Sequence, residues 1–298
     1  MTQRRTLSFL AATIVLALGS FDLDAQRSTA PVRRIDHIMI RADDPANVYA
    51  FFTDVLELPV AWPMMSPRAG VATGGVGFGN VNVEAIRVPG QKSQARRAQL
   101  LGFAFEPSPL AECLAELDRR GIRYGEPRPL ISSGPDGSKN TLWTNVTLRQ
   151  FSDGEAADAT MHVFLSEYSP KYVNVEQRRE RLRRQLAENG GGPLGVKAMK
   201  EVIVGVTDLE AARGLWQTLL DPTPLSAPST WQVGDGPAIR LLEAGENTTH
   251  GLVISVASLP KARAFLRGRD LLGIDSPQEA TIDPSKIEGL NIRLVENR

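Results

Sequence analysis

The sequence predicts an α+β fold built from repeated βαβββ modules, which pair into half-open curved sheets and form two tandem domains. Three observations predict it. One order of segments (a strand, an amphipathic helix, then extended segments) occurs four times with decreasing clarity. The 298 residues are enough for two domains. A glycine-rich stretch at 189–193 separates the second copy from the third.

The first copy is the clearest. Residues 35–42 alternate and are rich in isoleucine, which favours a strand. Asp43, Asp44 and Pro45 then supply a helix N-cap and an early-helix proline. Apolar residues at helical spacing predict a helix over 46–58, and three extended segments follow, at 60–64, 70–79 and 81–88.

The later copies repeat this order less clearly. The predicted helices cover 109–120, 208–220 and 259–267, and the strands that open each copy cover 100–105, 199–206 and 251–256. We therefore expect a first domain over 33–172, a linker helix and glycine-rich joint over 173–194, and a second, degenerate domain over 195–298. The linker helix carries five arginines. An anion-binding patch and a solvated helix both explain them, and we favour the solvated helix because glutamates are interleaved.

The first 25 residues have the pattern of a secretory signal peptide. Arg4 and Arg5 are followed by an apolar run at 7–19 and by Ala25 as the small residue before a cut. The run is about thirteen residues, short of the roughly twenty that a membrane span needs. We expect a periplasmic or secreted protein without stable membrane insertion after cleavage. An uncleaved anchor and a twin-arginine signal stay open as alternatives.

Charge and cysteine content exclude several classes. Lysine plus arginine and aspartate plus glutamate number 34 each, so nothing in the net charge favours nucleic acid as a partner. The single cysteine, Cys113, excludes an intrachain disulfide, and its helical surroundings predict a buried apolar residue rather than a nucleophile.

Two segments resemble a known family. Residues 35–40, Ile-Asp-His-Ile-Met-Ile, resemble the opening strand of vicinal oxygen chelate proteins, and residues 77–86 resemble the fourth strand of such a module. The superfamily includes glyoxalase I, extradiol dioxygenases and bleomycin-resistance proteins, and the closer match is to glyoxalase-like domain proteins. The resemblance covers 33–170 well and 195–296 weakly. It implies a cup-shaped sheet that holds one divalent metal through a histidine on the first strand and a glutamate on the fourth.

In this sequence those two positions are occupied by His37 and Glu84. Alternation places Ile35, Met39 and Arg41 on the same face as His37, and Asn80, Asn82 and Ile86 on the same face as Glu84. In the family the paired module supplies further ligands, but here Phe103 and Phe164 align with those positions. His162, two residues before Phe164, would complete a set of two histidines and one carboxylate.

The resulting hypothesis is a divalent-metal-assisted lyase, isomerase or dioxygenase that acts on a small molecule with vicinal oxygens. Iron, manganese, zinc, nickel and magnesium are not distinguished. The substrate would be oriented by Arg41, Asn80 and Asn82 and contacted by Phe103 and Phe164. The alternative is a metal-free protein that binds or sequesters a small molecule in the same cup, where aromatic residues favour a planar ligand. Pairing of modules within one chain or between two copies, as in a homodimer, stays open.

The second half lacks the ligand pattern. Glu201 falls at a histidine position, and Arg240 and Arg293 fall at the two glutamate positions. Glu201 with Arg240 or Arg293 could form an inward ion pair, which would stabilise a metal-free cup or bind an anionic ligand, and we favour a structural role for this half.

Overall fold

The computed structural model describes residues 29–67, 69–91, 98–134, 136–154 and 156–297. The signal peptide predicted for residues 1–25 lies outside these ranges. Within them, no helix has the length and apolar character that crossing a bilayer requires.

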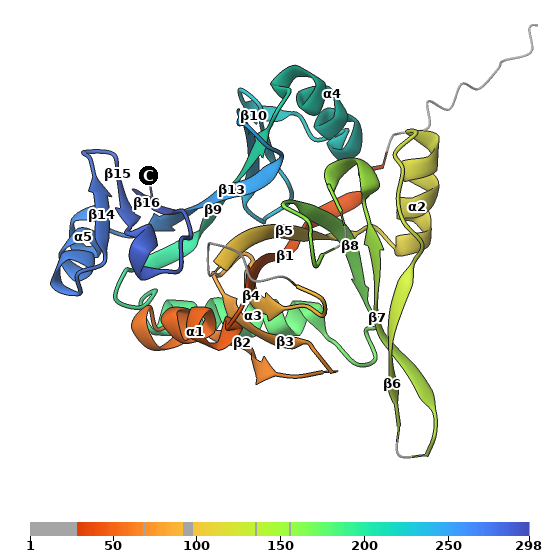
Figure 1. Cartoon of the computed structure of the whole chain (residues 1–298), viewed down its shortest axis with the longest axis horizontal. Helices are drawn as coiled ribbons and strands as arrows, with labels where there is room; N and C mark the ends of the chain where they lie inside the picture. The colour runs from red at the N-terminus through yellow and green to blue at the C-terminus, as the bar shows by residue number, and fades with distance from the viewer. Residues whose placement is uncertain (1–28, 68, 92–97, 135, 155, 298) are drawn as a thin grey trace, which may run out of the picture.

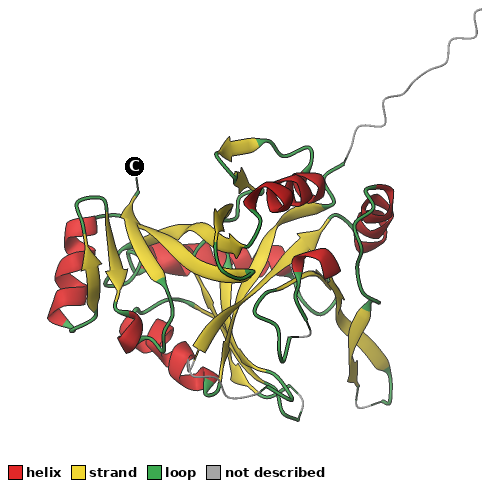
Figure 2. Cartoon of the chain, turned by 45° about the horizontal axis from the view of Figure 1, so that its top comes forward, coloured by secondary structure: helices red, strands yellow, loops and turns green. Residues whose placement is uncertain are grey.

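Two eight-stranded mixed sheets, one from each half of the chain, make up the molecule (Figures 1 and 2). The strand order in the first is β2-β3-β4-β1-β5-β8-β7-β6, and the second has the same order, β10-β11-β12-β9-β13-β16-β15-β14. In each sheet the first strands of two βαβββ modules pair antiparallel at the centre. The predicted tandem βαβββ architecture is therefore confirmed.

The first sheet is built from two modules. The first comprises β1 (Val32–Ala42), α1 (Pro45–Ala50), a π-helical turn (Phe51–Val55), β2 (Val60–Met65), β3 (Ala72–Gly77) and β4 (Asn82–Arg87). The second comprises β5 (Ala98–Pro107), α2 (Leu110–Arg119), β6 (Arg128–Ser133), β7 (Lys139–Thr147), a 3-10 turn (Arg149–Phe151) and β8 (His162–Tyr168).

The second sheet repeats the plan. Its modules comprise β9 (Val196–Val206), α4 (Leu209–Leu220), β10 (Leu225–Ala227), β11 (Thr230–Gln232) and β12 (Ala238–Glu243), then β13 (Thr248–Val256), α5 (Leu259–Gly268), β14 (Leu272–Asp275), β15 (Glu279–Ile282), a 3-10 turn (Pro284–Lys286) and β16 (Ile292–Glu296). Helix α3 (Val175–Glu188) connects the two sheets.

The first helix differs from the expected one. Asp44 caps it as predicted, since its Oδ1 accepts a hydrogen bond from the Ala46 amide at 3.1 Å. The α-helical part ends at Ala50, however, and a π-helical turn continues to Val55. In that turn the Leu56 amide bonds the Phe51 carbonyl, and both Phe52 and Leu56 are buried. The apolar spacing therefore predicted the buried face, but not the wider turn.

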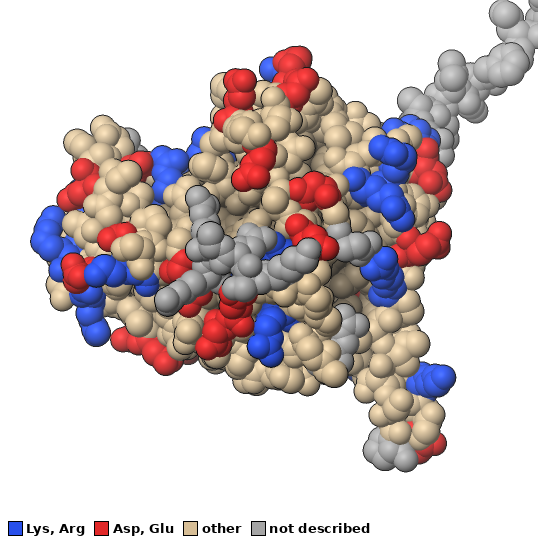
Figure 3. Space-filling model, in the orientation of Figure 1, with Lys and Arg blue, Asp and Glu red and all other residues tan. Residues whose placement is uncertain are grey.

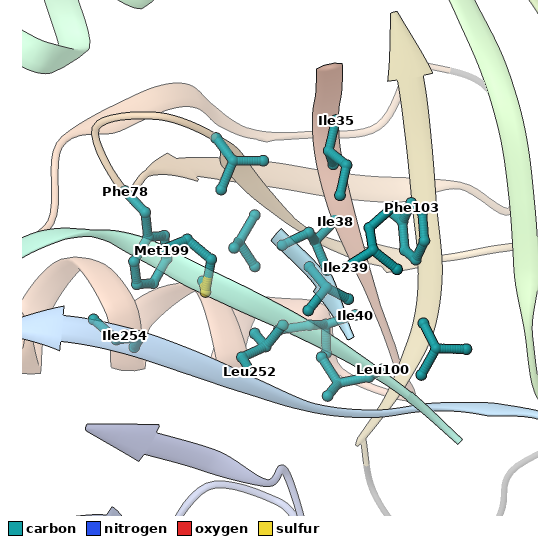
Figure 4. Close-up of a cluster of buried hydrophobic side chains, with 14 of the residues drawn as sticks. Ile35, Ile38, Ile40, Phe78, Leu100, Phe103, Met199, Ile239, Leu252 and Ile254 are labelled. Carbon is teal, nitrogen blue, oxygen red and sulfur yellow. The ribbon is translucent and has the colours of Figure 1, made fainter. Parts of the chain in front are cut away.

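One hydrophobic core serves both sheets. Figure 4 shows Ile35, Ile38 and Ile40 of β1 beside Ile239 of β12 and Leu252 of β13, all fully buried. Aromatic side chains extend this contact, because Trp216 of α4 packs against three phenylalanines of the first half: Phe103, Phe105 and Phe151. The second sheet thus covers the apolar face of the first.

The opposite face of the first sheet is concave. Trp62 on β2 and Tyr168 on β8 are five strand steps apart, which in a flat sheet would be roughly 24 Å. The guanidinium carbon of Arg178, from α3, nevertheless lies 5.6 Å from the Trp62 ring centroid and 5.1 Å from the Tyr168 ring centroid. The sheet must therefore curl strongly around this face, as the cup model requires.

Helix α3 is not the solvated linker that we expected. Its side chains Arg179, Leu182 and Leu186 are buried, at a spacing that puts them on one helix face. Gly77 at the end of β3 permits this approach, since a Cβ there would lie 3.1 Å from the Leu182 side chain.

Acidic and basic side chains are interspersed across the face of the molecule drawn in Figure 3.

The aromatic contact between the two halves predicts a large loss of stability on truncation. Trp216→Ala removes a side chain that is 2 % exposed, so the free energy of unfolding should fall by about 3–5 kcal/mol. Urea denaturation followed by circular dichroism measures it. A loss below about 1 kcal/mol would contradict a shared core.

Cys113 should be unreactive in the folded protein. Its side chain is fully buried, and burial raises the pKa of the thiol to about 12, so almost no thiolate is present at neutral pH. Iodoacetamide should label Cys113 at pH 8 only after the chain is unfolded, which mass spectrometry detects. Rapid labelling of the native protein would show that this helix opens readily.

Candidate functional site

A β-bulge in β1 places two adjacent polar residues on the concave face. Ile35 pairs with Phe105 and His37 with Ala104, so Asp36 is an extra residue without a partner across the ladder. Asp36 and His37 consequently both lie on the concave side, while Ile35 and Ile38 belong to the core. This corrects the expectation that Ile35 shares a face with His37.

His37 lies between two carboxylates. Its Nδ1 is 2.8 Å from Asp36 Oδ2, and its Nε2 is 3.4 Å from Glu84 Oε2. Glu84 is fixed in turn, because Thr73 on β3 donates a short hydrogen bond to Glu84 Oε1. Trp62 Nε1 donates to the Thr73 hydroxyl at 3.3 Å. The structure therefore brings together the two residues that the sequence singled out.

Asp36 is the centre of a buried polar network. Its Oδ2 accepts from His37 and, at 3.0 Å, from the Tyr168 hydroxyl. Its Oδ1 accepts from Arg179 Nη2 at 3.1 Å, and Arg179 also donates to Glu106 at 2.6 Å. The side chain of Asp36 is 1 % exposed. A carboxylate this deep needs such partners, because an uncompensated buried charge is costly.

The network shifts both titrating partners. Burial alone would raise the pKa of Asp36, but the His37 hydrogen bond and the positive charges of His37, Arg178 and Arg179 hold that pKa well below its usual range. Burial would lower the pKa of His37, yet the hydrogen bond to Asp36 and the charges of Glu84 and Asp36 raise it above its usual value. Without a metal, the protonated imidazole is thus favoured between its carboxylates, and a metal bound at Nε2 would have to displace the proton from that nitrogen.

Apolar side chains form the wall next to this network. Met39, Leu101, Ala104 and Phe164 make a small buried cluster of their own, separate from the main core. The Phe164 ring contacts the His37 ring, with centroids 5.6 Å apart. Ligand oxygens at His37 would therefore lie beside an apolar surface.

His162 lies on the concave face, level with Glu84 across the strands and not with His37. Its Cα pairs with Gly102, which pairs with Met39, which pairs with Glu84. It contacts Phe164 with ring centroids 5.3 Å apart. Among the described residues, no three His, Cys, Asp or Glu side chains are grouped closely enough to hold a metal. His162 is therefore not brought into one ligand set with His37 and Glu84.

Two of the three polar residues expected to contact the substrate, Arg41 and Asn80, are engaged elsewhere. Arg41 donates to Gln99 and to the carbonyls of Ala156 and Ala157, so it anchors a loop. Asn80 exchanges two hydrogen bonds with the backbone of Met199 on β9, which ties the first sheet to the second. Asn82 alone of the polar group stays beside the pair, buried and directly opposite His37.

Phe103 faces the core, which corrects its expected place in the cup. A second irregularity causes this: Met39 pairs with Gly102 but Ile40 pairs with Leu100, so Leu101 is the extra residue. The bulge reverses the alternation, and Leu101 and Ala104 lie on the concave face instead.

The register also shows which ligand positions are missing. Because β1 and β5 are antiparallel and pair in parallel with β4 and β8, an approximate two-fold axis relates the two modules. Under this symmetry Gly102 of β5 takes the place that His37 has on β1, and Phe164 of β8 takes the place that Glu84 has on β4. Neither has a ligand atom, and a Cβ at Gly102 would lie 1.9 Å from the His162 carbonyl oxygen.

A divalent metal therefore fits this site in part. Two ligands bonded at about 2.0–2.2 Å to a tetrahedral ion lie roughly 3.4 Å apart, and His37 Nε2 and Glu84 Oε2 have that separation. Asp36 on Nδ1 is the carboxylate partner that metal-bound histidines commonly have. The donors number two, so water or substrate oxygens would fill the other positions.

Sequence reasoning missed the residues that support the pair. Asp36, Thr73 and Tyr168 were not singled out, and the arginines of α3 were considered as an anion-binding patch but assigned to a solvated helix. The position of Asp36 directly before His37 was a usable signal, but only a bulge makes adjacent residues share a face. The spacing of Arg179 with Leu182 and Leu186 was a second signal, because it marks a buried helix face.

The second sheet carries ion pairs at the corresponding positions. Arg240 Nε lies 2.7 Å from Glu201 Oε2, as expected, while Arg293 bonds Glu279 on β15. Positive and negative charges thus neutralise each other where the first sheet has His37 and Glu84.

Comparison with known proteins gives structural matches only. No protein-family model matches the sequence, and no curated protein matches it. A mutant of 4-hydroxymandelate synthase from Streptomyces coelicolor is 11% identical with a TM-score of 0.58, over 89% of this chain and 93% of that one. A variant of homoprotocatechuate 2,3-dioxygenase from Brevibacterium fuscum is 15% identical with a TM-score of 0.55, over 91% and 73%.

A third match is the Mn(II)-bound glyoxalase from Novosphingobium aromaticivorans, 12% identical with a TM-score of 0.54, over 90% of this chain and 83% of that one. Identities this low show the fold and nothing finer. Together with the module order, the paired central strands and the curled first sheet, they show that this chain has the vicinal oxygen chelate fold that its sequence resembles.

Proposed function

We propose that the chain is a divalent-metal-assisted enzyme, a lyase, isomerase or dioxygenase, that acts on a small molecule with vicinal oxygens. The observation that carries this proposal is the pair His37–Glu84 on the concave face, backed by Asp36. The similar folds of a dioxygenase and a Mn(II)-bound glyoxalase support it. A bound metal would supply Lewis acidity toward the two substrate oxygens.

The chain's own residues prepare the site. Asp36 fixes the imidazole so that Nε2 faces Glu84, and Thr73 fixes the carboxylate of Glu84. The apolar cluster around Phe164 limits water next to the pair. Because both donors are held before any ligand arrives, little ordering is left to be done on binding.

Metal-free binding of a small molecule is the second candidate. The observation that favours it is the pair Gly102 and Phe164 at the other two ligand positions, which leaves His37 and Glu84 without a third protein ligand among the residues that the structure describes. In that case His37 and Glu84 would hydrogen-bond the ligand directly, and the Phe164 ring would contact its planar part.

Location and the role of the second half belong to the proposal as well. We propose export of the protein to the periplasm or the exterior, on the pattern of residues 1–25. We further propose that the second half, 195–298, is structural, because its ion pairs replace the ligand positions and its core surface covers the first sheet.

Metal titration separates the two candidates. The chelator-treated full-length protein should bind one Mn²⁺ in calorimetry, and His37→Ala and Glu84→Gln should each weaken binding at least about tenfold, since each removes one of two ligands. The matched control His250→Ala alters an exposed histidine and should leave the affinity unchanged. Absence of any divalent-metal binding, or unchanged affinity in His37→Ala, would leave the metal-free candidate.

Restoring a carboxylate at the third position gives a complementary prediction. Phe164→Glu should tighten Mn²⁺ binding at least about tenfold, because the new side chain lies next to His37. The buried charge should lower the melting temperature without metal and make its rise on adding Mn²⁺ larger than in the wild type. In the control Phe164→Gln, the glutamine has the size of the glutamate but carries no charge. Equal Mn²⁺ affinity in both variants would mean that Phe164 is not at a ligand position.

A further inference from the structure

Arg178 occupies an unusual place on the concave face. It comes from the connecting helix α3, and its guanidinium lies over the rings of both Trp62 and Tyr168, on opposite arms of the curled sheet. Its side chain is 15% exposed. The cation is therefore held in position by two aromatic faces and largely shielded from water.

Only part of the donor capacity of Arg178 is used by its neighbours, through an interaction with the Tyr168 hydroxyl. Its Nη2 is 3.6 Å from Asp36 Oδ1, beyond hydrogen-bond distance. Asp36 already accepts from His37, Tyr168 and Arg179. Within the described part of the chain, the buried Nε and Nη2 of Arg178 donate no hydrogen bond. Buried donors are almost always satisfied, so a ligand acceptor is the natural partner.

The neighbouring arginine is a useful contrast. Arg179 donates to Asp36, Glu106 and Glu176, and its side chain is buried. Its role in the folded chain is complete without a ligand. Two adjacent residues of α3 thus differ: one closes the network of Asp36, and the other extends a cation into it.

We propose that Arg178 is a specificity-determining residue that binds a carboxylate on the molecule held at the concave face. The ligand class is then a small organic acid that carries vicinal oxygens and a compact apolar part. A planar guanidinium fork suits a carboxylate because it donates two parallel hydrogen bonds. This inference rests on the proposed function for the location of the ligand, but not on the presence of a metal.

The surroundings match each part of such a ligand. The carboxylate would meet Arg178, the vicinal oxygens would meet His37 and Glu84, and the apolar part would meet the cluster around Phe164. Arg178 and His37 both approach the same carboxylate of Asp36, so the acid group and the oxygens of one small molecule can reach both.

Two probes that differ by one charge test this. 3,4-Dihydroxybenzoate has two vicinal hydroxyl oxygens, an aromatic ring and a separate carboxylate, and its methyl ester lacks the charge. Calorimetric titration of the full-length protein, with and without Mn²⁺, should show 3,4-dihydroxybenzoate binding at least about tenfold more tightly than the ester. Equal affinities for the two probes, or no binding of either at millimolar concentration, would overturn the proposal without any variant being made.

Variants assign the effect to the residue. Arg178→Gln should remove the preference for 3,4-dihydroxybenzoate over its methyl ester, and Arg178→Lys should keep part of that preference because the charge remains. The matched control Arg184→Gln changes an exposed arginine of the same helix and should keep the full preference. A preference that survives in Arg178→Gln, with an unchanged melting curve, would place the anion elsewhere.

The metal titration keeps this proposal distinct from the proposed function. Arg178→Gln should retain Mn²⁺ binding while it loses discrimination between the probes. If wild-type protein binds no metal yet prefers 3,4-dihydroxybenzoate over its ester, the metal-assisted enzyme fails and the role of Arg178 stands. If metal binds and the two probes bind equally, the proposed metal site stands and the role of Arg178 fails.

Discussion

The carboxylate of Asp36 is the interaction on which the candidate site depends. It is almost fully buried, and it accepts hydrogen bonds from β1, β8 and the connecting helix α3 through His37, Tyr168 and Arg179. Strand β1 is therefore tied by one charge to β8 and α3, through residues that follow Asp36 by 132 and 143 positions. Because a buried carboxylate is tolerated only when it is fully partnered, the same bonds that stabilise Asp36 also set the orientation of His37 toward Glu84.

The two halves of the chain share one architecture and use it differently. Both sheets have the same strand order, and they join through a common core that includes Trp216 of the second half. In the first sheet the concave face carries a histidine between carboxylates. In the second, Glu201 and Arg240 neutralise each other at the corresponding positions. The second sheet contributes an apolar surface that covers the apolar face of the first sheet. The concave face of the first sheet is therefore the side on which a ligand can bind.

Helix α3 links these two features. Its buried face of Arg179, Leu182 and Leu186 packs on the end of the first sheet, and Arg183 forms an ion pair with Asp235 in the second half. The helix connects the halves and also projects charge into the network at Asp36. Any shift of one sheet against the other would therefore be felt at the candidate site through the placement of this helix.

The sequence by itself determined the module order, the pairing of modules into curved sheets, the buried faces of the helices within the modules, and the two residues at the centre of the site, His37 and Glu84. Hydrophobic period and capping residues are local signals, and a single chain displays them. Only the tertiary structure decided the rest. Bulges at Asp36 and Leu101 reverse the alternation of β1 and β5, and a period-two pattern contains no sign of an extra residue. The spacing of buried residues in α3 marks an apolar face, but the end of the sheet that covers this face lies far away in the sequence. No local pattern identifies that partner.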